Sequence, residues 1–343
     1  MPAVTKVAVI GGGSFGTVMA NIAALNGVPV TVWMRSTELA NAINREHENT
    51  TYLPGHALDE GVTATLSMVE AVADAQLIFL AVPSSSFRTV VTEVLSVASK
   101  SAMLVSTTKG IEAGSFLLMS QVLTELAPHF PIGVLSGPNL AKEIAASQLT
   151  GTVIASPHEP LRSAVQSILE AATFRIYTND DMFGVELGGS LKNIYAIIAG
   201  MASALGMGHN TNSMLVTRGL TEMARFGRVL GADPMTFLGL AGVGDLVVTC
   251  SSPLSRNFRL GFALGEGKSL EAASQEIGQV VEGVNTVRLV SQRAAELEIY
   301  MPLASGLYRV LFEGASLDSV VSSLMLGEQA LDVEFAAHTD KII

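Results

Sequence analysis

The chain has 343 residues, which is more than one ordinary hydrophobic core accommodates, so its length favours two domains. Hydrophobic residues make up 49% and aromatic residues 6% of the sequence, and the formal net charge is -11. This negative balance argues against a broad nucleic-acid-binding surface, because phosphate backbones require an excess of Lys and Arg. An anionic small molecule would instead have to be bound by a few locally placed cations.

The hydrophobic content invites a membrane interpretation, which the pattern does not support. The longest uncharged stretch, residues 193–217, contains His209 and several Asn, Gly and Ser residues, whereas a bilayer span is usually continuously apolar. We therefore predict no membrane span, and since a strand pattern begins at Val4 we also expect no signal peptide. The single cysteine, Cys250, cannot form an internal disulfide, which favours a reducing cytoplasm. We interpret it as a small buried hydrophobic residue, with a reactive thiol as the alternative.

In the first half, short apolar runs alternate with stretches of helical spacing. Strands are predicted at residues 4–10, 28–33, 76–82, 102–107 and 132–136, and helices at 14–26, 36–48, 84–98, 113–127 and 138–147. Two further β segments, 151–156 and 174–177, flank a helix near 157–172. Strands that alternate with helices predict a mostly parallel sheet covered on both faces, which is an α/β domain.

After about residue 181 the pattern becomes helical throughout. Helices are predicted at residues 181–205, 211–230, 256–266, 269–277, 284–297, 303–313 and 316–326. The sequence Asn179-Asp180-Asp181 forms a plausible turn and helix cap at the boundary. We predict an α/β N-terminal domain over 1–180, an all-α C-terminal domain over 181–336, and a short tail over 337–343.

A glycine-rich segment follows the first strand and opens the first helix. Residues 11–16 read GGGSFG, which satisfies the spacing G-x-G-x-x-G. Gly11 permits the tight turn, Gly13 lets the backbone approach a pyrophosphate, and Gly16 allows close packing of helix and strand. The first helical residues, Ser14 and Phe15, lie where the helix N-terminus offers amide groups to an anion. In this context the segment predicts a Rossmann-type dinucleotide site, with a purely structural turn as the alternative.

The end of the second strand bears on the choice of dinucleotide. An acidic residue there would bind a ribose 2′-hydroxyl, but the sequence reads Trp33-Met34-Arg35-Ser36, and the next carboxylate is Glu38. Arg35 can pair with a 2′-phosphate, so we expect NADP to be accepted. A solvated arginine on the following helix is the alternative.

Two more strand ends carry polar segments. Lys109 lies in the segment 107–110, which follows the fourth strand, and it could face both cofactor and substrate. An exposed surface lysine is the alternative interpretation. The segment Ser136-Gly137-Pro138-Asn139 follows the fifth strand and opens a helix. Its free amides form another potential anion site, although a simple helix start explains it equally well.

The helical half contains three charged positions of interest. Lys192 lies in an otherwise apolar helix, where desolvation would lower its pKa toward the range of a general acid or base. The alternative is a solvated lysine on the outer face. Asp245 follows a glycine turn and could hold an ammonium group. Arg256, within residues 255–257 at a helix start, offers planar donors to a phosphate, while helix capping by Ser255 is the alternative.

Taken in order, these segments resemble the NAD(P)-dependent glycerol-3-phosphate dehydrogenases of bacterial type. The resemblance covers nearly the whole chain, and its combination of motifs is far more specific than any one of them. The matching segments are GGGSFG (11–16), YLPG (52–55), AVPS (81–84), TTKGIE (107–112), SGPNLAKE (136–143), GVELGGSLKN (184–193), TRGLTEM (217–223), GVGDLVVTC (242–250), SRN (255–257) and VEGVNT (281–286).

The resemblance implies an activity and a setting. Members of this family interconvert sn-glycerol 3-phosphate and dihydroxyacetone phosphate, with NADP or NAD as a diffusible co-substrate, and supply the backbone of glycerophospholipids. It further implies a cytoplasmic homodimer that acts on a phosphorylated triose. We predict neither a metal site nor a nucleic-acid partner.

The resemblance also assigns roles to residues. Lys192 matches the family's proton acceptor, and we expect Lys109 and Asp245 to act with it. The positions around substrate are Lys109, Gly137, Asn139, Lys192, Asp245, Ser255, Arg256 and Asn257. The positions around the dinucleotide are Gly11, Gly13, Ser14, Phe15, Gly16, Arg35, Lys109, Ala141, Arg256, Val280 and Glu282.

The sequence departs from the family pattern at two places. Asn139 stands where Ser or Thr is usual, and His209-Asn210 replaces the more usual Asp-Asn. Because Asn replaces another polar residue at a position that contacts substrate, we expect the exchange to affect that one contact and not the activity.

Two other functions remain open at this point. One is a related dehydrogenase of a hydroxy acid, which would need a site for a carboxylate rather than for a phosphate. The other is a nucleotide sensor without catalytic activity, which would not need Lys192, Asp245 and Arg256 together.

Overall fold

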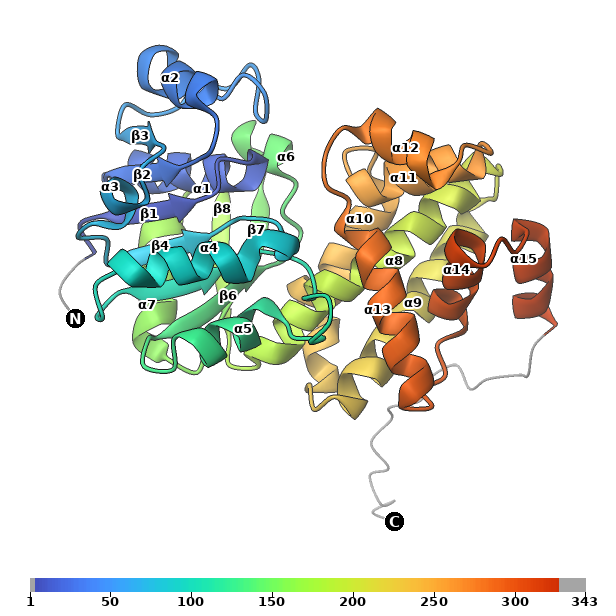
Figure 1. Cartoon of the computed structure of the whole chain (residues 1–343). Helices are drawn as coiled ribbons and strands as arrows, with labels where there is room; N and C mark the ends of the chain where they lie inside the picture. Colours follow the sequence, from blue (N-terminus) through green and yellow to red (C-terminus); the bar gives the residue numbers. More distant parts are fainter. Residues whose placement is uncertain (1–3, 327–343) are drawn as a thin grey trace. The chain divides into compact units, whose positions relative to one another are not determined.

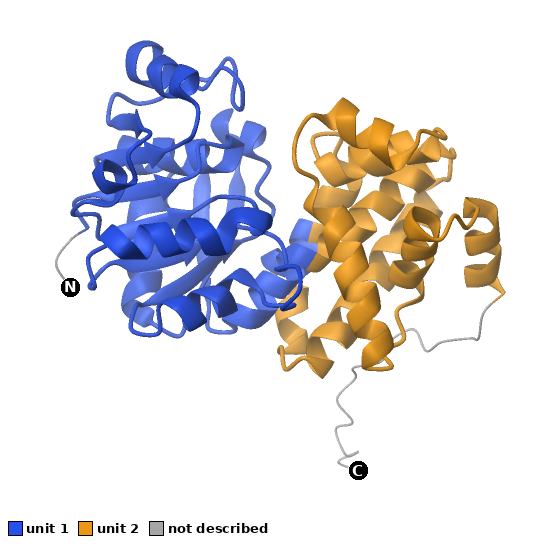
Figure 2. Cartoon of the chain, viewed as in Figure 1, with its two compact units in different colours: residues 1–190, 240–245 blue, residues 191–239, 246–343 orange. Residues whose placement is uncertain are grey.

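The computed structural model describes residues 4–326 (Figure 1). These residues divide into two compact units, shown in blue and orange in Figure 2. The first unit extends to Ser190 and includes residues 240–245, and the second contains the rest. The division therefore falls ten residues beyond the predicted boundary of 180/181. The predicted tail, 337–343, lies outside the described residues.

The first unit contains one sheet, which has eight strands in the described part of the chain. These strands are β1 (Val7–Ile10), β2 (Val30–Trp33), β3 (Val62–Thr65), β4 (Leu77–Leu80), β5 (Met103–Ser106), β6 (Ile132–Ser136), β7 (Thr150–Ala155) and β8 (Phe174–Asn179). Their order is β3-β2-β1-β4-β5-β6-β7-β8, and within the described residues only the β6–β7 pair is antiparallel. The mostly parallel sheet predicted from the alternation of strands and helices is confirmed.

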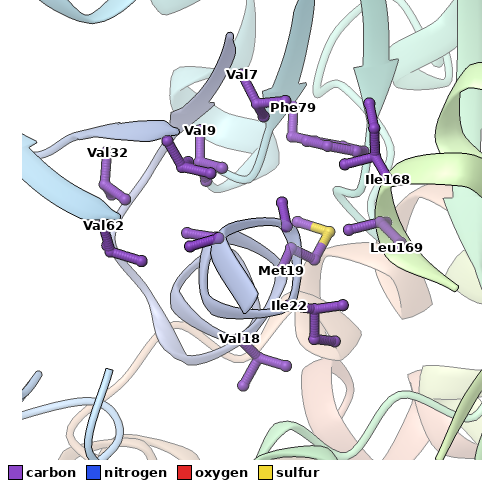
Figure 3. Close-up of a cluster of buried hydrophobic side chains, with 14 of the residues drawn as sticks. Val7, Val9, Val18, Met19, Ile22, Val32, Val62, Phe79, Ile168 and Leu169 are labelled. Carbon is purple, nitrogen blue, oxygen red and sulfur yellow. The ribbon is translucent and has the colours of Figure 1, made fainter. Parts of the chain in front are cut away.

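Helices cover both faces of this sheet (Figure 1). They are α1 (Ser14–Leu25), α2 (Thr37–Glu46), α3 (Met68–Val72), α4 (Ser84–Val97), α5 (Met119–Leu126), α6 (Ala141–Ala145) and α7 (Glu159–Leu169). Alternate residues of a strand enter different cores, as the period of two requires. Val9 packs with Met19 of α1 and Leu169 of α7 (Figure 3), whereas Ile10 packs with Phe87 of α4 in the core on the other face.

The strand order creates the position where such sheets bind ligands. The chain passes from β1 outward to β2 and β3, then returns to form β4 on the other side of β1. The carboxyl ends of β1, β4, β5 and β6 lie at the same edge because these strands are parallel. A reversal of this kind leaves a crevice outside the carboxyl ends of the strands, where a dinucleotide can bind. Of the four segments that the sequence singled out in this half, three follow β1, β5 and β6, and the fourth, at Arg35, follows β2.

The predicted helix 113–127 is wrong at its start. The helix α5 begins only at Met119, because the preceding residues form a turn in which Gly114 has φ 89° and Phe116 has φ 60°. An antiparallel bridge between Ile111 and Leu118 closes this turn. Residues in the left-handed region cannot continue a right-handed helix. The short strand β3 and helix α3 were not predicted.

The remaining elements are helical, as predicted, although the sequence analysis predicted no helix over residues 234–251. They are α8 (Met182–Ala204), α9 (His209–Val229), η1 (Pro234–Leu238), the π-helix η2 (Leu240–Gly244), α10 (Asp245–Ser251), α11 (Arg256–Gly265), α12 (Leu270–Ile277), α13 (Glu282–Glu296), α14 (Pro302–Phe312) and α15 (Leu317–Met325). The helix α8 begins in the first unit and its later residues belong to the second, while η2 belongs to the first. Within residues 4–326, no helix combines the length and apolar character that a membrane span requires.

A buried carboxyl group joins three helices of the second unit. Glu222 of α9 is 2% exposed and accepts hydrogen bonds from the backbone nitrogens of Leu303 (2.7 Å) and Ala304 (3.2 Å) at the start of α14. The hydroxyl of Tyr195 on α8 donates a third hydrogen bond to it, at 3.2 Å. Burial raises the pKa of Glu222 to about 7, although these hydrogen bonds oppose the rise.

We expect Glu222 to make the protein less stable as pH rises. Its pKa is near 4.5 in the unfolded chain and about 7 in the folded one, so its stabilising contribution is complete below pH 4.5 and is lost as pH approaches 7. Glu222→Gln removes this titration. The melting temperature of the variant should therefore fall less steeply than that of the wild type between about pH 5 and pH 7.

The wild type and the variant are compared by the slope of melting temperature against pH. Their absolute melting temperatures are not compared, because Gln also changes the hydrogen bonds at α14. Glu186 has a pKa raised by burial to about 7 and remains in both proteins, so its contribution is common to the two curves. Parallel curves for the wild type and the variant would rule out this role of Glu222.

Candidate active site

The glycine segment after β1 has the geometry that a pyrophosphate requires. Gly11 has φ 120°, and a Cβ atom there would lie 2.5 Å from the carbonyl oxygen of Ala81, just after β4. A Cβ at Gly16 would lie 2.1 Å from the carbonyl oxygen of Gly11. At Gly13, by contrast, a Cβ would meet no heavy atom of residues 4–326 within 4 Å. Gly11 and Gly16 are therefore required by packing, whereas Gly13 borders open space at the N-terminus of α1. The segment fits a dinucleotide.

A residue that the sequence analysis missed fixes this segment. Asn49 is fully buried, and its side-chain nitrogen donates to the carbonyl oxygen of Gly12 (2.9 Å) and to the hydroxyl of Thr17 (2.8 Å). Its side-chain oxygen accepts from the backbone nitrogen of Tyr52, whose carbonyl oxygen accepts from Ser14 Oγ at 2.8 Å. The segment YLPG was noted in the sequence, but no local pattern shows that Asn49 reaches back to the glycines.

The other predicted dinucleotide positions of the first unit lie in different surroundings. Phe15 and Ala141 are partly buried and pack against the core cluster around α1. Arg35 follows β2 and is exposed. An exposed guanidinium at this place can bind a 2′-phosphate without first breaking a buried contact within the protein.

Lys109 joins three segments of the first unit. Its ammonium lies 2.6 Å from Oδ2 of Asp245 and donates to the carbonyl oxygen of Gly137 at 2.8 Å. The side chain of Asp245 is 1% exposed and that of Lys109 is 21% exposed. A carboxylate this deeply buried needs a paired and hydrogen-bonded cation. The interpretation of Lys109 as an isolated surface residue is therefore wrong, and Asp245 holds an ammonium group, as the sequence suggested.

The segment after β6 is tied to the neighbouring strand. Thr152 of β7 is fully buried, and its hydroxyl lies 3.0 Å from both the carbonyl oxygen of Ser136 and Nδ2 of Asn139. Gly137 has φ 149°, and a Cβ there would lie 3.1 Å from Thr152. Gly137 is thus needed both for its backbone conformation and for the close approach to β7. Asn139 and Gly137 both lie at the same sheet edge as Lys109.

In the second unit, Lys192 is 7% exposed and lies on the buried face of α8. Its Nζ lies 2.6 Å from Oγ1 of Thr249 on α10, which is 4% exposed. The alternative of a solvated lysine on the outer face is therefore wrong. The sequence analysis quoted the segment GVGDLVVTC but did not single out Thr249. Its position four residues after Asp245 on the same helix is a signal that could have identified it.

The three residues at the start of α11 have separate roles. The hydroxyl of Ser255 caps the helix by accepting from the backbone nitrogen of Phe258 at 3.2 Å. Asn257 is buried, donates to Oδ1 of Asn193 at 2.9 Å and accepts from the backbone nitrogen of Gly283 at 3.2 Å. The helix-capping interpretation of Ser255 thus holds in the structure, and Asn257 connects α11 with α8 and α13.

Arg256 is exposed and points toward the segment before α13. Its Nη1 donates to the carbonyl oxygen of Val280 at 3.0 Å, and Val280 is itself 52% exposed. The nearby charge of Glu282 favours the charged form of this guanidinium, and an arginine remains charged in proteins. The structure therefore brings together Arg256, Val280 and Glu282, which the sequence placed around the dinucleotide.

Family models match both halves of the chain. The N-terminal model of NAD-dependent glycerol-3-phosphate dehydrogenase matches residues 6–161, and the corresponding C-terminal model matches residues 181–322. The chain belongs to the NAD-dependent glycerol-3-phosphate dehydrogenase family. The glycine segment and Lys109 lie within the first match, and Lys192, Asp245 and Arg256 lie within the second.

Individual relatives of this family are similar over almost the full chain. A glycerol-3-phosphate dehydrogenase [NAD(P)+] of Ectopseudomonas mendocina is 57% identical over 98% of this chain and 98% of its own length. The enzyme of the same name from Alcanivorax borkumensis is 55% identical over 96% of each chain. A solved glycerol-3-phosphate dehydrogenase from Coxiella burnetii superposes with a TM-score of 0.91 at 36% identity, over 95% of this chain and 100% of its own.

We expect Asn49 to be required for dinucleotide binding. Asn49→Ala removes the donor at 2.9 Å and leaves the buried carbonyl oxygen of Gly12 with the long contact from the hydroxyl of Thr17 at 3.5 Å, which should cost about 1–3 kcal/mol of unfolding free energy. The glycine segment should also lose its fixed shape, so the Kd for NADH and NADPH, measured by titration calorimetry, should rise about tenfold, the equivalent of one hydrogen bond.

Asn44→Ala is a matched control, since Asn44 holds β3 through the backbone of Ala64 rather than the glycine segment. This variant should be destabilised while its Kd for the dinucleotide stays close to that of the wild type. Equal Kd values for all three proteins would exclude Asn49 from shaping the site.

Proposed function

We propose that this protein interconverts sn-glycerol 3-phosphate and dihydroxyacetone phosphate, with NADH or NADPH as the reductant. The observation that carries the proposal is the family match across both halves, which includes the buried charges of Asp245 and Lys192 and the partly buried charge of Lys109. Buried charges are costly, so their presence at matched positions favours a catalytic use over a packing role. A nucleotide sensor without activity would not need all three.

Lys192 is proposed as the proton donor and acceptor. The reduced nicotinamide, when bound, supplies the hydride that reduces C2 of dihydroxyacetone phosphate. Lys192 then gives a proton to the oxygen on C2 as negative charge develops there, and takes it back in the reverse reaction. Thr249 holds Nζ of Lys192 at 2.6 Å, which restricts the long side chain to one position. Lys109, fixed by Asp245, adds positive potential that stabilises the developing alkoxide.

Arg256 is proposed as the main ligand of the phosphoryl group. Its planar guanidinium suits bidentate contact with phosphate oxygens, and its contact with the carbonyl oxygen of Val280 orients the donors. Ser255 caps α11 and so sets where its first-turn amides point. Asn257 is proposed to contribute to the same subsite through its hydrogen bonds to Asn193 and Gly283, which hold the start of α11 in place.

The proposal distinguishes this protein from a hydroxy acid dehydrogenase. A substrate with a carboxylate and no phosphate would not use the donors of Arg256 in the same way. The family match concerns glycerol-3-phosphate dehydrogenases and does not favour that alternative. NADPH is proposed to be accepted because the exposed Arg35 follows β2 where a ribose-binding carboxylate would otherwise stand.

The cellular setting is part of the proposal. We propose a cytoplasmic homodimer whose product enters glycerophospholipid synthesis, as the family resemblance implies. The single cysteine, Cys250, is buried, which suits a reducing compartment.

The activity is tested by initial-rate measurement with dihydroxyacetone phosphate and each reduced cofactor, followed at the nicotinamide absorbance band. We expect oxidation of both cofactors that depends on the phosphorylated ketone, and no reaction with ketoacids that lack phosphate. No consumption of either cofactor with dihydroxyacetone phosphate would refute the proposed function.

The role of Lys192 is tested in the same assay. Lys192→Ala should lower kcat by ~10²–10⁴-fold, because general acid catalysis typically contributes that much, while the Kd for the cofactor stays unchanged. Lys100→Ala, at an exposed lysine, is the matched control and should retain full activity. A near-normal kcat for Lys192→Ala would remove this residue from the mechanism.

A further inference from the structure

The segment after β6 contains two polar atoms whose hydrogen-bonding capacity is unused within the protein. Among the described residues, neither Oγ of Ser136 nor Oδ1 of Asn139 has a hydrogen-bond partner, although both atoms are buried. Ser136 as a whole is 1% exposed. Most buried polar atoms in proteins are paired, because an unpaired one loses its contact with water and gains nothing. Two such atoms within four residues point to a ligand.

The hydrogen bonds of Thr152 determine which atom of Asn139 is unpaired. The single hydroxyl hydrogen of Thr152 is donated to the carbonyl oxygen of Ser136, at 3.0 Å. Toward Asn139 the hydroxyl can then only accept, so the side-chain nitrogen of Asn139 must be the atom 3.0 Å from it. The unpaired atom of Asn139 is therefore the carbonyl oxygen, which can accept a hydrogen bond and cannot donate one.

The hydroxyl of Ser136 lies close to the side chain of Lys109. A Cβ atom built on Gly189 of α8 would be 2.4 Å from Oγ of Ser136 and 3.6 Å from Cδ of Lys109. The glycine thus leaves room for the hydroxyl between α8 and the lysine stem. Between Ser136 and Asn139, the carbonyl oxygen of Gly137 accepts from the ammonium of Lys109. The two unpaired atoms therefore flank the residue that fixes Lys109.

The chemistry of these atoms selects one end of the proposed substrate. Dihydroxyacetone phosphate carries a phosphoryl group and a C2 carbonyl, which are mainly acceptors at neutral pH, and a C1 hydroxyl, which donates as well. Only that hydroxyl can donate to Oδ1 of Asn139. The hydroxyl of Ser136 can donate to the oxygen on C1. The segment was interpreted from the sequence as an anion site or a simple helix start, but an acceptor-only oxygen does not suit an anion.

We propose that Ser136 and Asn139 recognise the hydroxymethyl end of the substrate and make the enzyme specific for a three-carbon phosphate with a free C1 hydroxyl. This proposal rests on the proposed function and deepens it. A substrate with a methyl group in place of that hydroxymethyl group leaves both protein atoms unpaired in the complex. Sites built to hydrogen-bond a substrate hydroxyl reject such analogues strongly for this reason.

The test compares dihydroxyacetone phosphate with hydroxyacetone phosphate, which lacks only the C1 hydroxyl. The wild type should prefer the former by at least ~10²-fold in kcat/KM. Ser136→Ala and Asn139→Ala should each lower kcat/KM for dihydroxyacetone phosphate by ~10-fold or more. For hydroxyacetone phosphate, kcat/KM of both variants should stay within about threefold of the wild-type value. The ratio of kcat/KM between the two substrates should therefore decrease. Where turnover of the analogue is too slow, its competitive inhibition constant is used in its place.

A matched serine directly after β7, beside the start of β6, separates this role from a structural one. Ser156 is fully buried, but its hydroxyl donates to the carbonyl oxygen of Ile132 at 2.6 Å. Ser156→Ala should therefore lower the melting temperature and leave the substrate preference unchanged. Ser136→Ala removes an unpaired hydroxyl, so its melting temperature should be equal to or higher than that of the wild type while the preference narrows.

The outcomes distinguish failure of the inference from failure of the proposed function. If the wild type does not reduce dihydroxyacetone phosphate, the proposed function fails. If it does, but Ser136→Ala and Asn139→Ala lower kcat/KM for both ketones equally or for neither, the hydroxymethyl assignment is overturned. A fall in the melting temperature of Ser136→Ala would also contradict it, because the hydroxyl would then have a partner within the protein.

Discussion

The ion pair between Lys109 and Asp245 is the interaction on which the site in the first unit depends. Asp245 is 1% exposed and lies in the first turn of α10, where the helix N-terminus favours a negative charge. Removing the partner of such a buried charge typically costs about 3–5 kcal/mol. Because the ammonium also contacts the carbonyl oxygen of Gly137, one cation links the ends of β5 and β6 with the start of α10.

This link requires backbones to approach closely, and glycines make that possible. A Cβ on Gly188 would lie 2.8 Å from the carbonyl oxygen of Ala241 in η2, just before Asp245, and a Cβ on Gly189 would meet Ser136. The π-helix η2 is an uncommon conformation that often occurs at functional sites. Together these features hold Lys109 in place. In the proposed mechanism its ammonium therefore needs no reorganisation to stabilise the transition state.

Local sequence patterns predicted the sheet and most helices and singled out Lys109, Lys192 and Asp245 as candidates, because each has a local physical signature. The glycine spacing marks the turn after β1, and Lys192 is conspicuous in an apolar helix. The short strand β3, with its sequence VTAT, lacks enough apolar residues to be recognised. The roles of Asn49 and Glu222 depend on partners 32 and 81 positions away, which no local pattern reveals. The start of α5 was predicted too early because Phe116 adopts a left-handed backbone conformation, which its side chain does not indicate.

The coupling between Lys109 and Asp245 can be measured directly by a double-mutant cycle. Unfolding free energies from urea denaturation would be compared for the wild type, Lys109→Met, Asp245→Asn and the double variant. The account predicts a coupling energy of about 2 kcal/mol or more, well above the value for an exposed ion pair, with the double variant less destabilised than the sum of the single ones. A coupling energy near zero, with additive effects, would contradict it.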